Sequence, residues 1–271
     1  MKVQVDSNGK VYLTSQNKVL EANGYNGIPK YEIYGTSIVK TSVNVTNKFS
    51  SVEVIQNGAM NYAFSENTTV YGILNFDNLA SIDQRGLAYA FYGADIYSAS
   101  FPELLNVAGN GLDHCFYNCY NFTSVSFPKL THIGVSGLAQ CFYKCGITSV
   151  SFPELTKVEG NGMASAFTYC PIKTASFPKL KDLQYTACLS NLFNYCTALE
   201  DVYFYALNTG SFTSNYTNQL SGLMQYTGNT INHNVHFPSN MQTTISGLTG
   251  YPLFGGTSGK VTLLFDLPAT S

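Results

Sequence analysis

The sequence predicts an elongated α/β solenoid built from short parallel strands that alternate with short helical or 3₁₀ turns. Three features of the 271 residues support this fold: a Ser-Phe-Pro motif returns about every 25 residues, apolar residues hold fixed places around it, and charged residues make up only 11% of the chain. One such unit is too short to enclose its own apolar face. Neighbouring units must therefore stack on one another to form a continuous core.

The repeat is clearest at five phenylalanines, Phe76, Phe101, Phe127, Phe152 and Phe177, which are spaced 25, 26, 25 and 25 residues apart. With this Phe as position zero, apolar residues recur at positions −5, −2, +3 and +6. The apolar-x-Phe step has the two-residue period of a strand. Pro follows at +1 in most units and has no N–H to give to a neighbouring strand, so we expect each strand to end there.

The second half of each unit carries a Gly-apolar pair and then Phe-x-x-Cys. Examples are Gly111-Leu112 followed by Phe116 and Cys119, and Gly162-Met163 followed by Phe167 and Cys170. This stretch is about long enough for one short helical or 3₁₀ turn that returns the chain across the far side of the unit.

Weaker units extend the array in both directions. The strong repeats cover 71–205 and the irregular repeats 206–271, and Phe49-x-x-Val52-x-Val54 opens the solenoid with Glu53 in the place of the repeat serine. Residues 1–48 do not fit the unit. They contain alternating apolar residues around Asp6-Ser7-Asn8-Gly9, a hairpin-turn signal, which predicts an N-terminal β cap over 1–48 and a solenoid over 49–271.

The unit L-x-x-V-x-F-P-x-L-x-x-I…G-L…F-x-x-C resembles the BspA-like leucine-rich repeats of bacterial surface proteins. The resemblance covers about 220 residues, with Phe where that family often has Leu and with a slightly longer period. It implies a secreted or surface-displayed protein that adheres or binds a ligand. It does not identify the ligand, because a fold alone is weak evidence of function.

Composition limits the classes of partner. A net charge of −2 without a Lys/Arg cluster gives no surface for a polyanion, so we expect no nucleic-acid partner. No apolar run approaches the ~18 residues of a membrane span. The first six residues have no hydrophobic signal core. An export signal removed from this chain, another route of export, and retention inside the cell all remain compatible with the sequence.

The cysteines raise the question of metal binding. The chain has seven: Cys115, Cys119, Cys141, Cys145, Cys170, Cys188 and Cys196. Two Cys-x-x-x-Cys pairs one repeat apart could bring four thiols together for zinc. However, Ala occupies the same two slots in neighbouring units, at Ala90, Ala94 and Ala166, so the slots require a small apolar side chain. Buried free thiols are therefore favoured over stacked disulfides and over a metal site.

Other candidates for chemistry are weak. His233-x-x-His236 lacks an evident third ligand, and Gly-Gly-Thr-Ser-Gly-Lys at 255–260 has the wrong spacing for a phosphate loop, with Val261 where Ser or Thr belongs. We find no nucleophile elbow, metalloprotease motif or pair of carboxylates. The sequence predicts no catalytic residues, no cofactor and no metal, and hence no enzyme.

The outward positions of the strands form repetitive columns. Position −1 holds Ser100, Ser126, Ser151 and Ser176, and position −3 holds Ser98, Ser124, Ser149 and Thr174. Stacked ~4.8 Å apart, these residues form a ladder of hydroxyls that can hydrogen-bond to one another. Position +2 alternates in charge, with Glu103, Lys129, Glu154 and Lys179. Solenoid stability accounts for both columns without a ligand.

Ligand binding is expected where the pattern breaks. Ser-Phe-Pro is replaced by Tyr203-Phe204-Tyr205, the next connector is longer and contains Tyr216, and His236 follows on the next unit. Aromatic side chains on rigid strands are typical binding anchors. Tyr203, Tyr205, Tyr216 and His236 are thus the candidate ligand-binding residues. The alternative is that the repeat simply loses regularity as it nears its C-terminal end.

The sequence predicts a non-catalytic binding or adhesion module on the surface of a bacterial cell or secreted from it. Its partner would be a protein or a glycan. The alternative is a structural component of a phage tail or a surface appendage.

Overall fold

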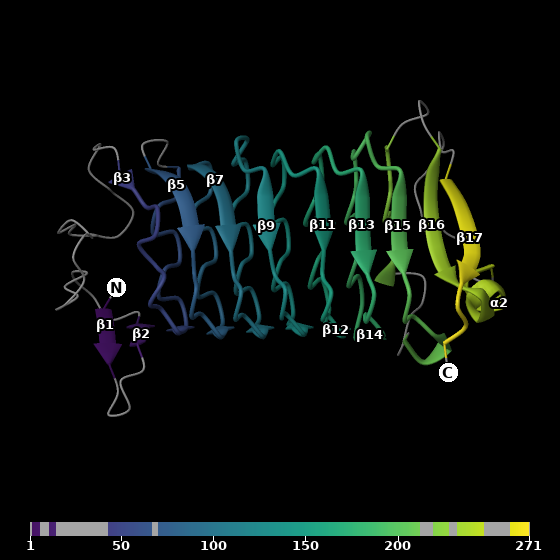
Figure 1. Cartoon of the computed structure of the whole chain (residues 1–271), viewed down its shortest axis with the longest axis horizontal. Coiled ribbons are helices and arrows are strands. Elements are labelled where there is room, and N and C mark those ends of the chain that lie inside the picture. The colour runs from purple at the N-terminus through teal and green to yellow at the C-terminus, as the bar shows by residue number, and fades with distance from the viewer. Residues whose placement is uncertain are drawn as a thin grey trace.

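The computed structural model describes residues 2–5, 11–14, 43–66, 70–211, 219–227, 232–246 and 261–270. The chain winds into one elongated array in which successive units stand side by side (Figure 1). Each regular unit contributes a long strand, a two-residue strand and a turn segment. We call the three sides of the array the strand face, the short-strand face and the turn face. The predicted parallel-stranded solenoid is confirmed.

The strand face contains two parallel sheets. The first has four strands: β3 (Val43–Asn44), β5 (Val70–Asn75), β7 (Asp95–Ser100) and β9 (Ser124–Ser126). The second has five: β11 (Ser149–Ser151), β13 (Thr174–Phe177), β15 (Asp201–Phe204), β16 (His233–Pro238) and β17 (Val261–Leu267). In the regular units the strands end at or just before the repeat Phe, as the following Pro predicts.

The short-strand face is a single sheet that the sequence did not predict. Its members are β1 (Lys2–Val5), β2 (Val11–Thr14), β4 (Val54–Ile55), β6 (Ser81–Ile82), β8 (Asn106–Val107), β10 (His132–Ile133), β12 (Lys157–Val158) and β14 (Asp182–Leu183). From β4 to β14 these are two-residue strands that carry the apolar residue at +6 into the core. β1 pairs antiparallel with β2, and β2 pairs parallel with β4, so the N-terminal hairpin continues this sheet.

The turn face corrects the expectation of short helical or 3₁₀ turns. Between Asn110 and Cys119, alternate N–H groups donate to the next unit, as from Phe116 to Cys141 O at 2.9 Å, while those in between donate three residues back, as from Cys115 to Leu112 O at 3.0 Å. An α-helix would instead donate four residues back. The neighbouring unit supplies carbonyls at every second residue, so the segment is a run of turns with φ near +55° at every fourth residue, including His114.

Regular helix is confined to the C-terminal part of the described residues. It consists of η1 (Thr209–Ser211), η2 (Ser239–Met241) and α2 (Gln242–Ser246). None of these has both the length and the apolar character that a bilayer crossing requires.

The core contains two columns of stacked aromatic rings. The repeat phenylalanines form a stack with centroids 4.9–6.0 Å apart, from Phe49 through Phe76, Phe101, Phe127, Phe152, Phe177, Phe204 and Phe237 to Phe265. A parallel column behind the turn face holds Phe64, Phe91, Phe116, Phe142, Phe167 and Phe193.

The first stack corrects the alignment of the opening unit. Phe49, and not Val54, takes the place of the repeat Phe, because its ring stacks on Phe76 at 5.1 Å. Val54 lies in β4 beside Ser81 of β6, on the short-strand face, so Glu53 does not belong to the serine column. The period-two spacing of Val52 and Val54 resembles the apolar-x-Phe step of a long strand. The sequence therefore placed the repeat position at Val54, five residues after its true place at Phe49.

The recurrent glycine at +10 is explained by a close approach. A Cβ on Gly162 would lie 2.6 Å from Val158 Cγ1 and 2.7 Å from Glu159 O, and a Cβ on Gly111 would lie 2.7 Å from Val107 Cγ1. The chain turns over the +6 side chain at this point. A larger residue at Gly111 or Gly162 would therefore require this turn to shift.

The strand face is interrupted between β9 and β11, which are not paired (Figure 1). Phe101 N–H donates to Ser126 O at 3.0 Å and Phe152 N–H to Ser176 O at 3.1 Å, but Phe127 N–H makes no matching bond to Ser151. The other two faces continue, through β10–β12 pairing and the turn-face bonds. Beside this interruption, Phe122 lies between Phe116 and Phe142 at the −5 slot, where the next unit has Ile147.

Candidate binding surface on the strand face

Three of the predicted site residues form one aromatic group. Tyr203 of β15 stacks on His236 of β16 with centroids 4.3 Å apart, and Tyr205 lies 5.9 Å from Tyr203 in a nearly parallel plane. Parallel pairing of β15 with β16 places Tyr203 directly beside His236. Tyr205 is 40% exposed. Tyr216 lies outside the described residues.

His236 is held on both sides by carboxylates. Its Nδ1 lies 2.9 Å from Asp266 Oδ2, and its Nε2 lies 3.1 Å from Asp201 Oδ1. Only 8% of His236 is exposed, so the imidazole covers one face of the Tyr203 ring and is itself little accessible to a ligand. This clasp ties β15, β16 and β17 together and fixes the orientation of the aromatic group.

The Tyr203 phenol remains a neutral hydrogen-bonding group. Desolvation, followed by the negative charge of Asp201, raises the pKa of Tyr203 above its ordinary value. The hydroxyl is therefore a donor and an acceptor at all physiological pH values.

A groove of about 600 Å³ runs along the strand face from β9 to this aromatic group. Val125 and Val150 contribute to its floor, Pro128 and Pro153 lie along it, and Tyr203 and Tyr205 close one end. Its volume is within the usual range of small-ligand sites. The groove thus joins the predicted tyrosines to the serine ladder, on which no ligand contact was predicted.

The hydroxyls in the groove have no partners within the described part of the chain, contrary to the expectation of a self-bonded ladder. This group comprises Ser126, Ser149, Ser151, Thr174 and Ser176. An O–H···O bond requires about 2.5–3.0 Å between the oxygen atoms, and the rotamers of these side chains do not bring the hydroxyls that close. These hydroxyls are therefore available to a ligand.

The two histidines of His233-x-x-His236 do not come together as a metal pair. His233 is fully buried and its Nδ1 contacts the carbonyl of Leu199, while His236 is engaged by Asp201 and Asp266. Among the described residues no group of three His, Cys, Asp or Glu side chains is arranged to hold a metal ion.

All seven cysteines are buried and free, as the Cys/Ala alternation predicted. The sequence did not reveal their hydrogen bonds. Cys119 Sγ donates to Phe91 O at 3.1 Å and Cys145 Sγ to Phe116 O at 3.1 Å, and Cys170 and Cys196 repeat this contact one unit further on. Desolvation raises the pKa of Cys119 to about 12. These thiols act as structural donors between units and not as nucleophiles.

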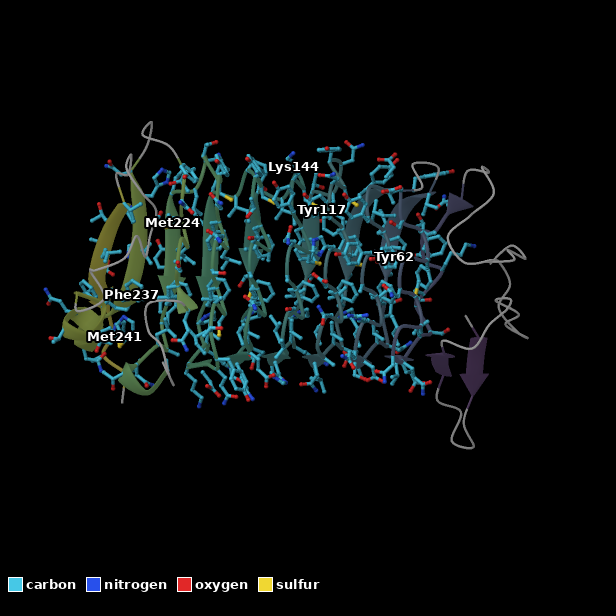
Figure 2. The ribbon with its side chains drawn as sticks, turned by 180° about the vertical axis from the view of Figure 1, so that it is seen from behind. Tyr62, Tyr117, Lys144, Met224, Phe237 and Met241 are labelled. Atoms are coloured by element: carbon cyan, nitrogen blue, oxygen red, sulfur yellow. The ribbon has the colours of Figure 1, made fainter. Side chains whose placement is uncertain are left out.

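The turn face carries an aromatic ladder that was not predicted from the sequence. Its members are Tyr92, Tyr117, Tyr143, Tyr169, Tyr195 and Tyr226. Figure 2 shows Tyr117 and Lys144 from behind the strands of Figure 1. Most neighbours stack at 4.4–4.9 Å; the Tyr143–Tyr169 pair is edge-on, with Lys144 Nζ over both rings at 5.6 and 5.3 Å. In the sequence, the ladder is visible as a Tyr that follows the turn-face Phe either directly, as in Phe91-Tyr92, or after one intervening residue, as in Phe167-Thr168-Tyr169.

Comparison with known proteins supports the repeat. Residues 112–243 match the model of the BspA type leucine-rich repeat region in 6 copies. A search of curated proteins found no match.

Two solved structures resemble the chain weakly. A leucine-rich cell surface protein from Faecalibacterium prausnitzii A2-165 has 11% identity and a TM-score of 0.19, over 96% of this chain and 92% of the other. A leucine-rich repeat protein from Bacteroides ovatus ATCC 8483 has 12% identity and a TM-score of 0.25, over 97% and 89%. Because both TM-scores are low, the assignment depends on the repeat match alone. Over residues 112–243, the chain is an array of BspA-type leucine-rich repeats.

Proposed function

We propose that this chain is a non-catalytic binding module that holds its ligand in the strand-face groove. The observation that carries the proposal is that one groove contains both the stacked tyrosines Tyr203 and Tyr205 and a row of hydroxyls without partners among the described residues. Tyr203 is already fixed by His236 and its two carboxylates, so little side-chain entropy is lost when a ligand binds.

The lining of the groove favours binding over catalysis. Apart from its two tyrosines, it consists of Ser, Thr, Pro, Val, Ala and Phe side chains. General acid–base catalysis requires a group whose pKa lies near the working pH, such as His, Asp or Glu. Among the described residues, the groove lining has no such group.

We also propose that the module is displayed on, or secreted from, a bacterial cell. The resemblance to BspA-like surface proteins is the basis of this location. At the N-terminal end, the hairpin of β1 and β2 is proposed to cap the array, because β2 pairs with β4 and so covers the first short strand of the solenoid.

A double variant tests the binding proposal. The chain and a Tyr203→Ala/Tyr205→Ala variant are applied to an array of host glycans and host extracellular proteins. A Tyr117→Ala/Tyr143→Ala variant removes two tyrosines from the turn face as a matched control. Circular dichroism verifies that each variant is folded. We expect ligand capture by the native chain and by the control, with a loss of at least ~1 kcal/mol for each true anchor in the strand-face variant. Equal capture by all three would contradict the assigned site.

A further inference from the structure

We infer that the groove takes a neutral saccharide, with one pyranose ring stacked on the open face of Tyr203. This inference rests on the proposed binding function and names its ligand class. It follows from three properties of the groove: its lack of charge, the one uncovered ring face, and its unpaired hydroxyl and backbone groups.

Among the described residues, the groove lining has no ionised side chain. The charges at position +2 are neutralised in pairs: Lys129 Nζ lies 2.7 Å from Glu103, and Lys179 Nζ lies 2.6 Å from Glu154. Asp201, in register with Thr174 of the groove, is engaged by His236 at 3.1 Å and by Asn234 at 3.0 Å. An anionic ligand such as a phosphate or an acidic sugar would find no cation in this lining and would meet the negative charge of Asp201, while a basic peptide would find that carboxylate already engaged. A neutral, polar ligand matches this surface.

Tyr203 offers one face of its ring to that ligand. His236 covers the other face at 4.3 Å. On the open side the neighbour in register is Ser176, whose side chain is too small to cover a phenol ring. A pyranose has a face of C–H groups and a rim of hydroxyls, so it can stack on the ring while its hydroxyls remain free to hydrogen-bond.

The hydroxyls of the groove match that rim. Ser126, Ser149, Ser151, Thr174 and Ser176 each offer one donor and two acceptor lone pairs, and none has a partner within the described residues. Sugar hydroxyls are donors and acceptors in the same way. The interruption beside β9 adds the unpaired backbone N–H of Phe127, which also lines the groove.

An extended peptide fits this interruption less well. A peptide strand inserted between β9 and β11 would need two strand spacings, about 9.6 Å. Yet these strands still have Cα atoms within 8 Å of each other. The opening is wide enough to expose polar groups and too narrow to admit another chain.

The test uses an array printed with neutral oligosaccharides, sialylated oligosaccharides, and extracellular proteins stripped of their glycans. Calorimetry with the neutral oligosaccharide that gives the strongest signal then follows. We expect Tyr203→Ala to raise Kd by about tenfold or more and Tyr203→Phe, which retains the ring, to change it by less than about threefold. Tyr117→Ala on the turn face is the matched control and should leave Kd unchanged.

A second variant adds a side chain and removes none. Ser176→Tyr places a ring beside Tyr203 in register, where it should stack as the turn-face tyrosines do and cover the open face. We expect a folded protein that no longer binds the saccharide. Binding that survives this variant would overturn the inference even if Tyr203→Ala proved unstable.

The outcomes separate the inference from the proposed function. Capture of stripped proteins alone, lost in Tyr203→Ala, would overturn the saccharide and leave the binding module intact. A preference for sialylated sugars, or sugar binding that is insensitive to Tyr203→Ala, would also overturn the inference. No Tyr203-dependent capture of any probe would overturn both.

Discussion

The turn face and the strand face both display tyrosines, but they present different parts of the ring. On the turn face, each tyrosine of the ladder stacks on the next unit at 4.4–4.9 Å except at the edge-on pair, so mainly ring edges and hydroxyls meet the solvent. On the strand face, Tyr203 follows a column of serines, and its ring has one covered side and one open side.

The contrast shows that exposure alone does not identify an aromatic binding residue. Tyr169 is 41% exposed and Tyr205 is 40% exposed, yet they stand in different surroundings. A ring in a continuous column stabilises its neighbours, while a ring at the start of a column is free to bind something else. What matters is the residue one unit away.

Emptying the core should have the largest effect, far above any surface change. Phe152→Ala removes a fully buried ring stacked between Phe127 and Phe177 at 5.7 and 5.6 Å. We expect a loss of roughly 3–5 kcal/mol in the free energy of unfolding, since rings on both sides are held in place and the cavity cannot collapse. Urea denaturation measures the effect. An unchanged midpoint would mean that this ring does not support the array.

Alkaline pH should weaken the units behind the turn face next. Desolvation raises the pKa of Cys119 and Cys170 from 9.0 to about 12, so the unfolded chain releases these protons at lower pH than the folded chain does. The stabilisation is complete below pH 9 and is lost as pH rises from 9 toward 12, by up to about 1.4 kcal/mol per pH unit for each thiol.

Denaturant titrations between pH 8 and 11 measure this slope. A Cys119→Ala/Cys170→Ala variant is the control and should show a shallower decline.

In the native chain at pH 8 we also expect little alkylation of the seven thiols, and complete alkylation after denaturation. Stoichiometric zinc, or a total well below seven free thiols, would contradict the assignment of reduced, structural cysteines.

Breaking the tyrosine ladder should cost less. Tyr117 stacks on Tyr92 at 4.9 Å and on Tyr143 at 4.4 Å while remaining partly exposed. We expect Tyr117→Ala to lower the free energy of unfolding by about 1 kcal/mol, from lost ring contacts, without affecting ligand capture. Thermal and urea unfolding are the measurements. If capture fell as well, the two faces would not differ in function as proposed.

The exposed ion pairs of the strand face should contribute least. Lys129 and Glu103 are about half exposed, at 52% and 47% of their side-chain area, although their charged atoms are 2.7 Å apart. We expect Lys129→Ala to change stability by about 0–1 kcal/mol, and less in high salt. A larger effect that persists in 1 M salt would indicate that the pair has a role beyond surface charge.

Most of the architecture followed from the period of the sequence, because stacking forces each unit to repeat the side chains of its neighbours. The Phe column, the strand ends at Pro and the small buried slots of Cys119 and Cys145 were all predictable for this reason. Helices were wrongly expected on the turn face, since Gly111-Leu112…Phe116 has an apolar spacing that both a short helix and a run of turns produce. The run of turns forms because alternate N–H groups of this segment donate to carbonyl groups of the neighbouring unit.

The candidate site was partly predictable. Tyr203, Tyr205 and His236 were identified as breaks in a column, and the structure brings their rings together. The groove itself could not be foreseen, because part of its lining lies at the missing pairing between β9 and β11. Nothing in the local strand sequence Ser124–Ser126 reveals that interruption.

The same interruption has a mechanical consequence. At every other junction from β5 to β13 the neighbouring units are joined by hydrogen bonds on all three sides, but between β9 and β11 only two sides are joined. A pull along the long axis loads these junctions in series, so each carries the same force. Among the junctions from β5 to β13, this one has the fewest bonds and should open first, at the end of the groove opposite Tyr203. The regular part of the array would then stretch at one defined place, and the lining of the groove would change its shape under tension.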